Sequence, residues 1–287
     1  MSKFKLSIKG LFGWADIDLD MDRPIRFLTG LNGSGKSTVL KILHHVLCRN
    51  AMSMECDPFL SVEYEDQSTK ATITKQNLND PVTLPDYHPA FQDVLILGES
   101  NVITLGRTVF ETYPMLADFS GRLTIDTCLS NYRYRLTYEN DQDVALFQKL
   151  WETNHSSLLL PDAKTDTPFC FVSRKTGKRV SSDDLSHGET RWFLLLYALV
   201  FLMHEDEILI LDSPENDLHI AWWHELMNIM RDVMKTRPFH CLIATHSPFI
   251  ISEDWEGAVD LTAQEQNKED QVPKEDASCQ LSEGTST

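Results

Sequence analysis

The feature that most constrains this chain is a glycine-rich loop between an apolar strand and an amphipathic helix. Residues 30–37 read GLNGSGKS and fit the pattern G-x-x-x-x-G-K-[ST]. Residues 25–29 predict a short buried strand, and apolar residues at helical spacing over 37–48 predict a helix. In this context the glycines let successive backbone N–H groups turn toward a phosphate, and the helix dipole adds positive charge. The sequence therefore predicts a nucleoside triphosphate site.

The loop also predicts roles for its side chains. Lys36 is expected to reach the β and γ phosphates, and Ser37 to place its hydroxyl on Mg²⁺, which prefers oxygen ligands. The loop therefore predicts a nucleoside triphosphate and Mg²⁺ as cofactors. The expected nucleotide-binding residues of this loop are Asn32, Gly33, Ser34, Gly35, Lys36, Ser37 and Thr38.

A carboxylate follows a second apolar segment late in the chain. Residues 208–211 are four apolar residues directly followed by Asp212. In an α/β chain this pattern is typical of a buried strand that delivers an acid to the Mg²⁺ shell beside a phosphate loop. We therefore expect Asp212 to be a metal ligand together with Ser37.

The order of the predicted elements indicates an α/β protein. Alternation of apolar and polar residues over 4–8 and 17–19 predicts N-terminal strands. Later the pattern alternates helix and strand, at 190–204, 208–211, 221–234 and 241–244. We expect a P-loop nucleoside triphosphatase fold with a mostly parallel sheet, N-terminal antiparallel strands and a small inserted arm.

Composition narrows the cellular setting and the domain layout. The formal net charge of −17 disfavours broad wrapping of nucleic acid, and six cysteines without a C-x-x-C pair favour reduced thiols in a cytoplasmic protein. The start of the chain lacks a secretory signal pattern, and the longest apolar run, 192–203, is too short to cross a bilayer, so no membrane partner is expected. The expected divisions are a core at 1–50 and 181–260, remaining core strands plus the arm at 51–180, and a disordered acidic tail at 261–287.

Two basic segments are candidates for contact with nucleic acid. Arg122, Arg133 and Arg135 interleave with tyrosines, a pattern typical either of a nucleic-acid surface or of an exposed strand face. Residues 174–179, RKTGKR, predict a hairpin turn. Its cations could contact DNA or an acidic partner, and the alternative is a turn that contacts only solvent. Phe12 and Trp14 are candidates for stacking on adenine, with core or hairpin aromatics as the alternative.

Three further motifs resemble those of ABC-type ATPases. Residues 185–189, LSHGE, resemble the signature motif, and residues 245–248, THSP, resemble the switch-histidine segment. Residues 214–219, PENDLH, resemble the segment after the Walker B acid. Together they resemble the compact, SMC-like, AAA-named ATP-binding proteins that are related to the OLD (overcoming lysogenization defect) nucleases and occur in bacterial anti-phage systems. The resemblance covers residues 4–250 as ordered motifs.

This resemblance implies ATP as the nucleotide, an ABC-ATPase-like fold and a head-to-tail homodimer or higher homo-oligomer. Ser186, Gly188 and Glu189 of one chain would meet the γ-phosphate held by the other, and His246 would sense that phosphate. The residues after Ile250 are too few for a TOPRIM-like nuclease domain, so a separate effector protein, a nuclease or toxin, is the expected partner.

One position departs from the family pattern. Related proteins read D-E-P-E, where the first Glu polarises the attacking water, but this chain has Ser213 after Asp212. Loss of a positioned general base costs on the order of 10²- to 10⁴-fold in rate, so slow hydrolysis is expected. Glu215 is the alternative candidate base, and Gln92 is a candidate for a glutamine that coordinates Mg²⁺.

The leading hypothesis is an ATPase that controls a separate effector in anti-phage defence, with Glu215, His246 and Ser213 at the catalytic positions. The main alternative is an ATP-bound scaffold that does not hydrolyse and sequesters a partner. A DNA-repair ATPase and the nucleotide-binding subunit of a transporter are less favoured. Transporter subunits usually carry an L-S-G-G-Q signature and an Asp-Glu pair, which this chain lacks.

Overall fold

The computed structural model describes residues 3–89, 94–97, 103–105, 122–138, 142–154, 157–161, 170–216 and 218–262. Its framework is a seven-stranded sheet, whose strands in spatial order are β14 (Ala258–Asp260), β3 (Ile25–Thr29), β13 (His240–Ala244), β12 (Ile208–Asp212), β6 (Val94–Leu97), β7 (Ile103–Leu105) and β8 (Arg122–Leu123). The strands from β14 to β6 are parallel, and β7 pairs antiparallel with both β6 and β8. The expected α/β fold with a mostly parallel sheet is confirmed.

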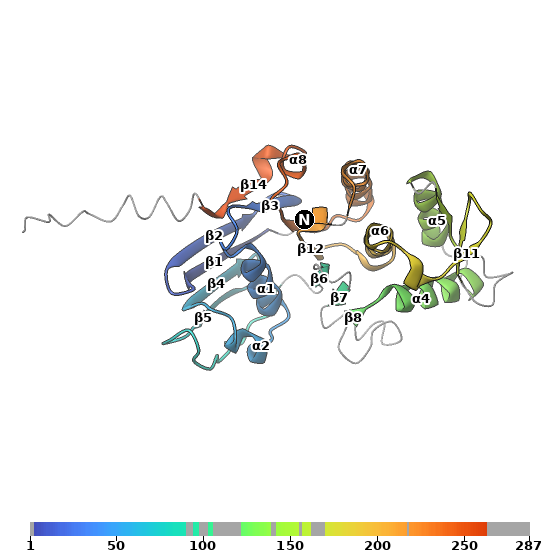
Figure 1. The fold of residues 1–287 in the computed structure, drawn as a ribbon. Coiled ribbons are helices and arrows are strands. Elements are labelled where there is room, and N and C mark those ends of the chain that lie inside the picture. The colour runs from blue at the N-terminus through green and yellow to red at the C-terminus, as the bar shows by residue number, and fades with distance from the viewer. Residues whose placement is uncertain are drawn as a thin grey trace, which may run out of the picture.

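A separate four-stranded antiparallel sheet contains the N-terminal strands. Its members in spatial order are β2 (Ala15–Met21), β1 (Phe4–Leu11), β4 (Ser61–Asp66) and β5 (Lys70–Thr74). Phe4, Leu6 and Ile8 are buried while Lys5 is exposed, so the alternation in the sequence reflects one buried face. In Figure 1 this sheet lies on the same side of the large sheet as helix α1 (Lys36–Leu47). The expected N-terminal antiparallel strands are also confirmed.

Helices cover both faces of the large sheet. Ile208 and Ile210 belong to the apolar cluster that contains α1 and the antiparallel sheet. Leu209 and Leu211 belong to the opposite cluster, with α6 (His187–Tyr197), the π-helical turn η2 (Ala198–Leu202) and α7 (Ile220–Thr236). Because β12 is buried on both faces, all four of these residues must be apolar.

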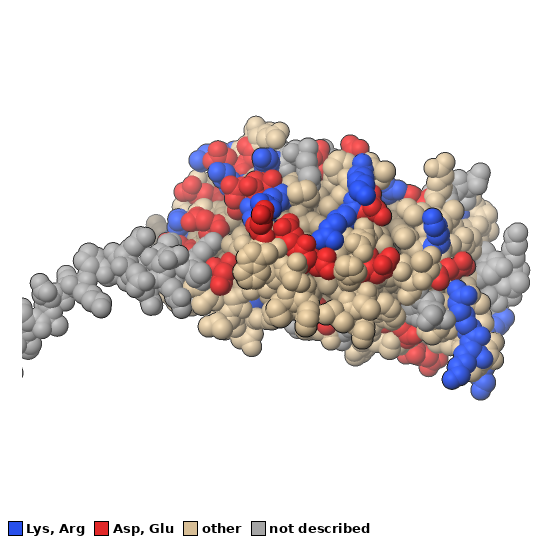
Figure 2. Space-filling model, turned by 90° about the horizontal axis from the view of Figure 1, so that it is seen from above, with Lys and Arg blue, Asp and Glu red and all other residues tan. Residues whose placement is uncertain are grey.

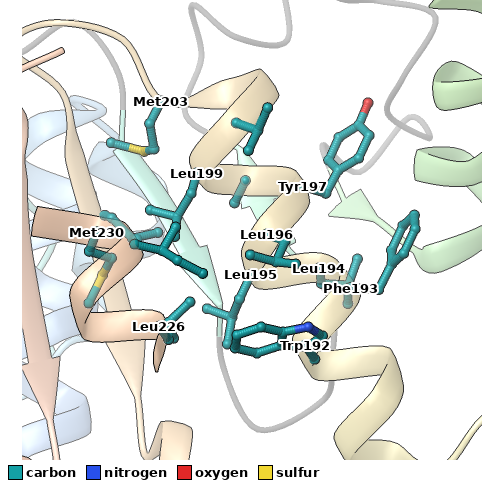
Figure 3. Packing of buried hydrophobic residues seen from close by; sticks show 14 of the residues in the cluster. Trp192, Phe193, Leu194, Leu195, Leu196, Tyr197, Leu199, Met203, Leu226 and Met230 are labelled. Atoms are coloured by element: carbon teal, nitrogen blue, oxygen red, sulfur yellow. The ribbon is translucent and has the colours of Figure 1, made fainter. Parts of the chain in front are cut away.

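Helix α6 is the most deeply buried helix of the second cluster. Residues 191–203 are all buried, so the apolar run of the sequence is a core helix, and its second half takes the π-helical form of η2. Figure 3 shows Leu195 of α6 and Leu199 of η2 on the side that faces Leu226 and Met230 of α7. Phe193 and Tyr197 point to the other side, where Phe193 meets Phe147 edge to face with ring centroids 5.4 Å apart.

The chain between β8 and η1 forms two helices and a small sheet, and we call this segment the arm. Helices α4 (Ile125–Tyr138) and α5 (Gln142–Asn154) pack against α6, and a three-stranded antiparallel sheet has the order β11 (Arg179–Val180), β10 (Phe171–Ser173), β9 (Leu158–Leu159). The strand alternative for Arg133 and Arg135 is wrong, because both residues lie on α4. Cys128, Leu129 and Tyr132 supply the helical burial spacing, which a short alternation of Arg and Tyr does not reveal.

The remaining short elements connect these layers. They are α2 (Ala51–Glu55), η1 (Ser182–Asp184), η3 (Pro214–Asn216), α8 (Pro248–Ile251) and η4 (Trp255–Gly257). Within the described ranges, no helix is long and apolar enough to cross a membrane.

The surface shows the uneven charge of the chain. In Figure 2, acidic side chains spread over one face, and Lys and Arg side chains gather in a few groups, one of them at the end of the molecule where Figure 1 places β11. The folded part extends into the segment expected as a tail, because Leu261 is fully buried and Thr262 is half-buried. Residues 263–287 lie outside the described ranges.

Candidate nucleotide site

The candidate site lies where three neighbouring parallel strands end. Strand β3 leads into the glycine-rich loop, β12 ends at Asp212, and β13 is followed by Thr245 and His246. Because parallel strands have their carboxyl ends at the same edge of the sheet, this order brings the three segments together. Strand β6 also reaches this edge with its Leu97 end, whereas Gln92 precedes that strand and lies outside the described residues.

The loop at residues 30–35 is held open by glycines in the left-handed region. Gly33 and Gly35 have φ of 84° and 89°. A Cβ atom at Gly35 would lie 2.9 Å from the Leu11 side chain, whereas a Cβ at Gly33 would meet nothing within 4 Å. Helix α1 begins at Lys36 without a side-chain cap. The first-turn amides of this helix are therefore available to an anion.

Lys36 lies against the inside of the loop. Its Nζ donates hydrogen bonds to the carbonyls of Gly30, at 3.0 Å, and Leu31, at 2.9 Å. Burial lowers the pKa of the Lys36 ammonium, and nearby carboxylates, Asp212 foremost, oppose that shift. The loop thus holds a buried amine that can turn from two carbonyls to a phosphate.

Ser37 and Asp212 are joined although they are far apart in the sequence. The Ser37 hydroxyl donates to Asp212 Oδ1 at 3.1 Å. Adjacent ligands of an octahedral Mg²⁺ with bonds of about 2.1 Å lie about 3 Å apart, so this hydroxyl and carboxylate fit two neighbouring ligand positions. The structure thus brings together the two side chains that the sequence proposes as metal ligands, and their binding of Mg²⁺ stays a prediction.

Ser213 adopts a backbone conformation that is uncommon outside glycine. Its φ is 47°, and its amide donates to the Ala244 carbonyl at 2.9 Å, which ties the end of β12 to the end of β13. Its hydroxyl lies 3.4 Å from Asp212 Oδ1. The side chain at position 213 is therefore short and turned toward the carboxylate of Asp212.

Glu215 contacts residues 245–248, which we call the switch segment. Its Oε1 accepts hydrogen bonds from the Thr245 hydroxyl, at 2.7 Å, and from the His246 amide, at 2.8 Å. Its Oε2 is buried and has no hydrogen-bond partner in the described part of the chain. The Thr245 hydroxyl in turn accepts from the Ser247 amide at 3.0 Å. This carboxylate therefore fixes the backbone on which the exposed His246 is carried.

The signature segment forms the start of α6. Ser186 caps the helix, and Glu189 Oε2 accepts from the Ser186 amide, at 2.9 Å, and hydroxyl, at 2.8 Å. Ser186 is exposed and Gly188 is half-buried, so this helix start lies at the surface. The carboxylate of Glu189, a predicted nucleotide contact, here stabilises the cap.

Three residues of the site were not identified from the sequence. Thr262 Oγ1 accepts from the Leu31 amide at 2.9 Å, so the C-terminal end of the described chain supports the loop. Arg191 is fully buried and donates to the Asp212 carbonyl at 3.2 Å, and Thr245 binds Glu215. The sequence could have indicated Arg191, because it is a charged residue next to a long apolar run that predicts a buried helix. No pattern in the sequence indicates a role for Thr262.

Two aromatic side chains lie beside the loop. Phe12 and Trp14 stack with ring centroids 6.3 Å apart, and Trp14 is 61% exposed. A Cβ at Gly35 would lie 3.2 Å from the Phe12 ring. A core role for Trp14 is therefore wrong, whereas the alternative of hairpin aromatics agrees with the structure, because both residues lie in the turn between the antiparallel strands β1 and β2. Stacking of the pair on a flat ligand beside the glycine-rich loop stays a prediction.

A protein-family model described as "AAA domain, putative AbiEii toxin, Type IV TA system" matches residues 139–252. This range includes the signature segment, Asp212 and the switch segment, and it excludes the glycine-rich loop. No curated protein matches the chain.

Several solved structures are similar in fold. The SMC head domain from Thermotoga maritima is 13% identical, with a TM-score of 0.47, over 90% of this chain and 92% of that one. An SMC head bound to the C-winged helix domain of ScpA is 11% identical, with a TM-score of 0.47, over 87% and 91%. The ATP-binding cassette MJ0796, in a dimeric post-hydrolysis state with ADP and Pi, is 15% identical, with a TM-score of 0.42, over 87% and 90%.

Proposed function

We propose that this chain is an ABC-type ATPase that binds Mg-ATP between two copies of itself. The observation that carries the proposal is the hydrogen bond of Ser37 to Asp212, beside a buried Lys36 and an uncapped helix start. The two oxygens can bind Mg²⁺, and the ammonium and the free helix amides can donate hydrogen bonds to phosphate. A site for Mg-triphosphate requires both kinds of group.

Each element of the site then has a role in binding ATP. The amides of residues 33–38 and the Lys36 ammonium bind the β and γ phosphates, and Phe12 and Trp14 offer a stacking surface to the base. Ser37 and Asp212 hold Mg²⁺, which neutralises phosphate charge and orients the γ-phosphate. His246, fixed by Glu215 through its amide, hydrogen-bonds to that phosphate.

Hydrolysis by this site is slow. Ser213 has no basic group, and Glu215 Oε1 already accepts two hydrogen bonds from the switch segment. The other oxygen of Glu215, Oε2, has no hydrogen-bond partner among the described residues but is buried, so neither side chain presents an exposed base to water. A missing general base lowers the rate of hydrolysis by about 10²- to 10⁴-fold. ATP-bound dimers then persist long enough to signal to a separate effector, a nuclease or toxin of a cytoplasmic defence system.

The signature residues of one copy complete the site of the other. Ser186 is exposed at a helix start, where amides and the dipole favour an anion such as the γ-phosphate. Light scattering with and without Mg-ATP tests this arrangement. Wild type is expected to become dimeric with ATP, Lys36→Ala to bind no ATP and stay monomeric, and Ser186→Arg to bind ATP yet stay monomeric. A Ser186→Arg variant that still dimerises with ATP would overturn the head-to-tail arrangement.

A second function, an ATP-bound scaffold without turnover, is favoured by the engagement of Glu215 in the switch segment. Steady-state hydrolysis across protein concentrations separates the two functions. Turnover per chain that rises with concentration and vanishes in Lys36→Ala supports the ATPase. ATP binding without turnover at every concentration supports the scaffold.

A further inference from the structure

A group of cations on the arm has no acidic partner. In the part of the chain that the structure describes, the side chains of Lys149, Arg174, Lys175 and Lys178 form no ion pair, although the protein contains 43 acidic residues. Residues 174–179 are all exposed, as is Lys149. Like charges held together without counter-charges repel one another, and an anionic ligand would offset this repulsion.

The cations on the turn are held by a rigid hairpin. Strands β10 and β11 pair antiparallel, and β10 also pairs with β9. The Ser173 amide donates to the Lys178 carbonyl at 2.8 Å, and the Gly177 amide donates to the Ser173 carbonyl at 2.8 Å. Gly177 takes a φ of 65°, which suits glycine. The turn therefore presents its cations without a large loss of backbone freedom on binding.

A shallow hollow lies between this hairpin and α5. Lys149 and Arg174 line it together with Gln148, Glu152 and Thr153, and its volume is about 530 Å³. The lining has two cations, two neutral polar side chains and one carboxylate, so its net positive charge favours an anionic group in this space. We define the basic edge as Lys149 together with Arg174, Lys175, Lys178 and Arg179.

The chemistry of the basic edge separates two kinds of acidic partner. Protein interfaces have an apolar core and few charged residues at their centre. Residues 174–179, RKTGKR, offer no apolar side chain at all, and the hollow offers only Ala145. Binding to a phosphate backbone needs no apolar contact, because cations displace condensed counterions. The composition of this edge therefore fits nucleic acid rather than an acidic protein.

We propose that the basic edge binds the phosphate backbone of duplex nucleic acid without reading its sequence. The contact is local, which is compatible with a net charge of −17 for the whole chain. It is also independent of the nucleotide site, since none of its residues belongs to that site.

The position of the basic edge links it to the signature segment. Strand β11 is followed by η1, and Ser186 lies two residues after the end of η1. The Ser157 hydroxyl, next to β9, donates to Glu189 Oε1 at 3.4 Å. If the proposed function holds, a duplex on this edge lies close to the segment that completes the partner's ATP site.

Fluorescence anisotropy of a labelled duplex DNA of about 30 base pairs, titrated without nucleotide at several salt concentrations, tests the proposal. The wild type is expected to bind with a dissociation constant of about 10⁻⁴ to 10⁻⁶ M near physiological salt. The triple variant Arg174→Gln, Lys175→Gln, Lys178→Gln should bind at least about 10-fold more weakly. Its log–log salt slope should be shallower by about 3, one unit for each cation removed.

The matched control removes the same charge from the antiparallel sheet, with Lys5→Gln, Lys9→Gln and Lys70→Gln, and should bind as the wild type does. Equal weakening in both triple variants, or no salt-dependent binding by the wild type, would overturn the proposal. So would a polyglutamate peptide that binds as tightly as the duplex, since it would indicate an acidic protein partner. ATP binding by the triple variant at Arg174, Lys175 and Lys178 should stay unchanged, which keeps this test separate from that of the nucleotide site.

Discussion

The carboxylate of Glu215 and the hydroxyl of Thr245 are hydrogen-bonded at 2.7 Å, and the same oxygen accepts the His246 amide. This contact joins the segment after β12 to the segment after β13. It gives Glu215 a role in positioning the switch segment, which differs from the role of a general base expected from the sequence.

Substitution of Glu215 separates these two roles. Glu215→Gln keeps an acceptor oxygen for Thr245 and His246, so ATP turnover should change by less than about threefold, whereas loss of a base would cost at least about 10²-fold. Glu215→Ala removes the acceptor and should lower the free energy of unfolding by about 1–3 kcal/mol. Steady-state ATPase assays and chemical unfolding measure these effects. A Glu215→Gln variant that is as inactive as Glu215→Ala but normally stable would indicate that Glu215 acts as the general base.

Substitution of Ser213 tests whether the missing base limits the rate. Ser213→Glu should raise turnover by up to about 10²- to 10⁴-fold, because it restores a carboxylate next to Asp212. Ser213→Gln has the same length without a base and should leave turnover near that of the wild type. Single-turnover hydrolysis with both variants measures the difference. Equal rates in the two variants would contradict the explanation of slow hydrolysis.

Two of the three loop glycines, Gly33 and Gly35, should differ in their tolerance of alanine. Both positions have positive φ, so each substitution pays the left-handed cost of about 1–2 kcal/mol. A Cβ at Gly35 also meets Leu11 at 2.9 Å, while a Cβ at Gly33 meets nothing. Gly35→Ala should therefore lower the free energy of unfolding by a further 1–3 kcal/mol or so. Urea unfolding compares the pair, and equal losses would contradict the packing at Gly35.

The contact of Thr262 with the loop should matter for nucleotide affinity. Thr262→Val removes the acceptor of the Leu31 amide and should weaken ATP binding by up to about 10-fold, since a hydrogen bond contributes about 0.5–1.5 kcal/mol. Thr262→Ser keeps the hydroxyl and should bind like the wild type. Titration with a fluorescent ATP analogue measures both. A serine variant as weak as the valine variant would indicate that packing of the methyl group matters instead.

His44 should make stability depend on pH. Burial, with His45 as a further cause, lowers the pKa of its ring from 6.5 to about 4. Between these values the unfolded state takes up a proton that the folded state does not, so stability falls as pH falls from 6.5 to about 4 and levels off below. The loss amounts to at most about 3 kcal/mol. His44→Leu should flatten this part of the pH profile in thermal unfolding, whereas His88→Leu, at a ring that is 80% exposed, should not.

Much of the fold could be predicted because its signals are local. The apolar run 208–211, the spacing of residues 37–48 and the glycine-rich loop each determine their own element, and parallel packing then places Asp212 beside Ser37. The arm was less predictable. Helix α4 buries only Cys128, Leu129 and Tyr132, so its periodicity is weak.

The contacts missed at the site have a different cause. Thr262 meets Leu31 only because β14 pairs with β3, and Glu215 meets Thr245 only because β12 lies next to β13. Such neighbours are set by strand order, which residue patterns within one segment do not contain.

The order of strands in the large sheet also sets the timing of assembly during synthesis. Strand β3 is made early, but its neighbours β13 and β14 come from residues 240–244 and 258–260. A nascent chain that ends before residue 240 has neither neighbour for β3 and lacks the partner of Ser213. The glycine-rich loop therefore lacks the strands that flank β3 until residues 240–260 have been synthesised, and its supported form can assemble only after that point.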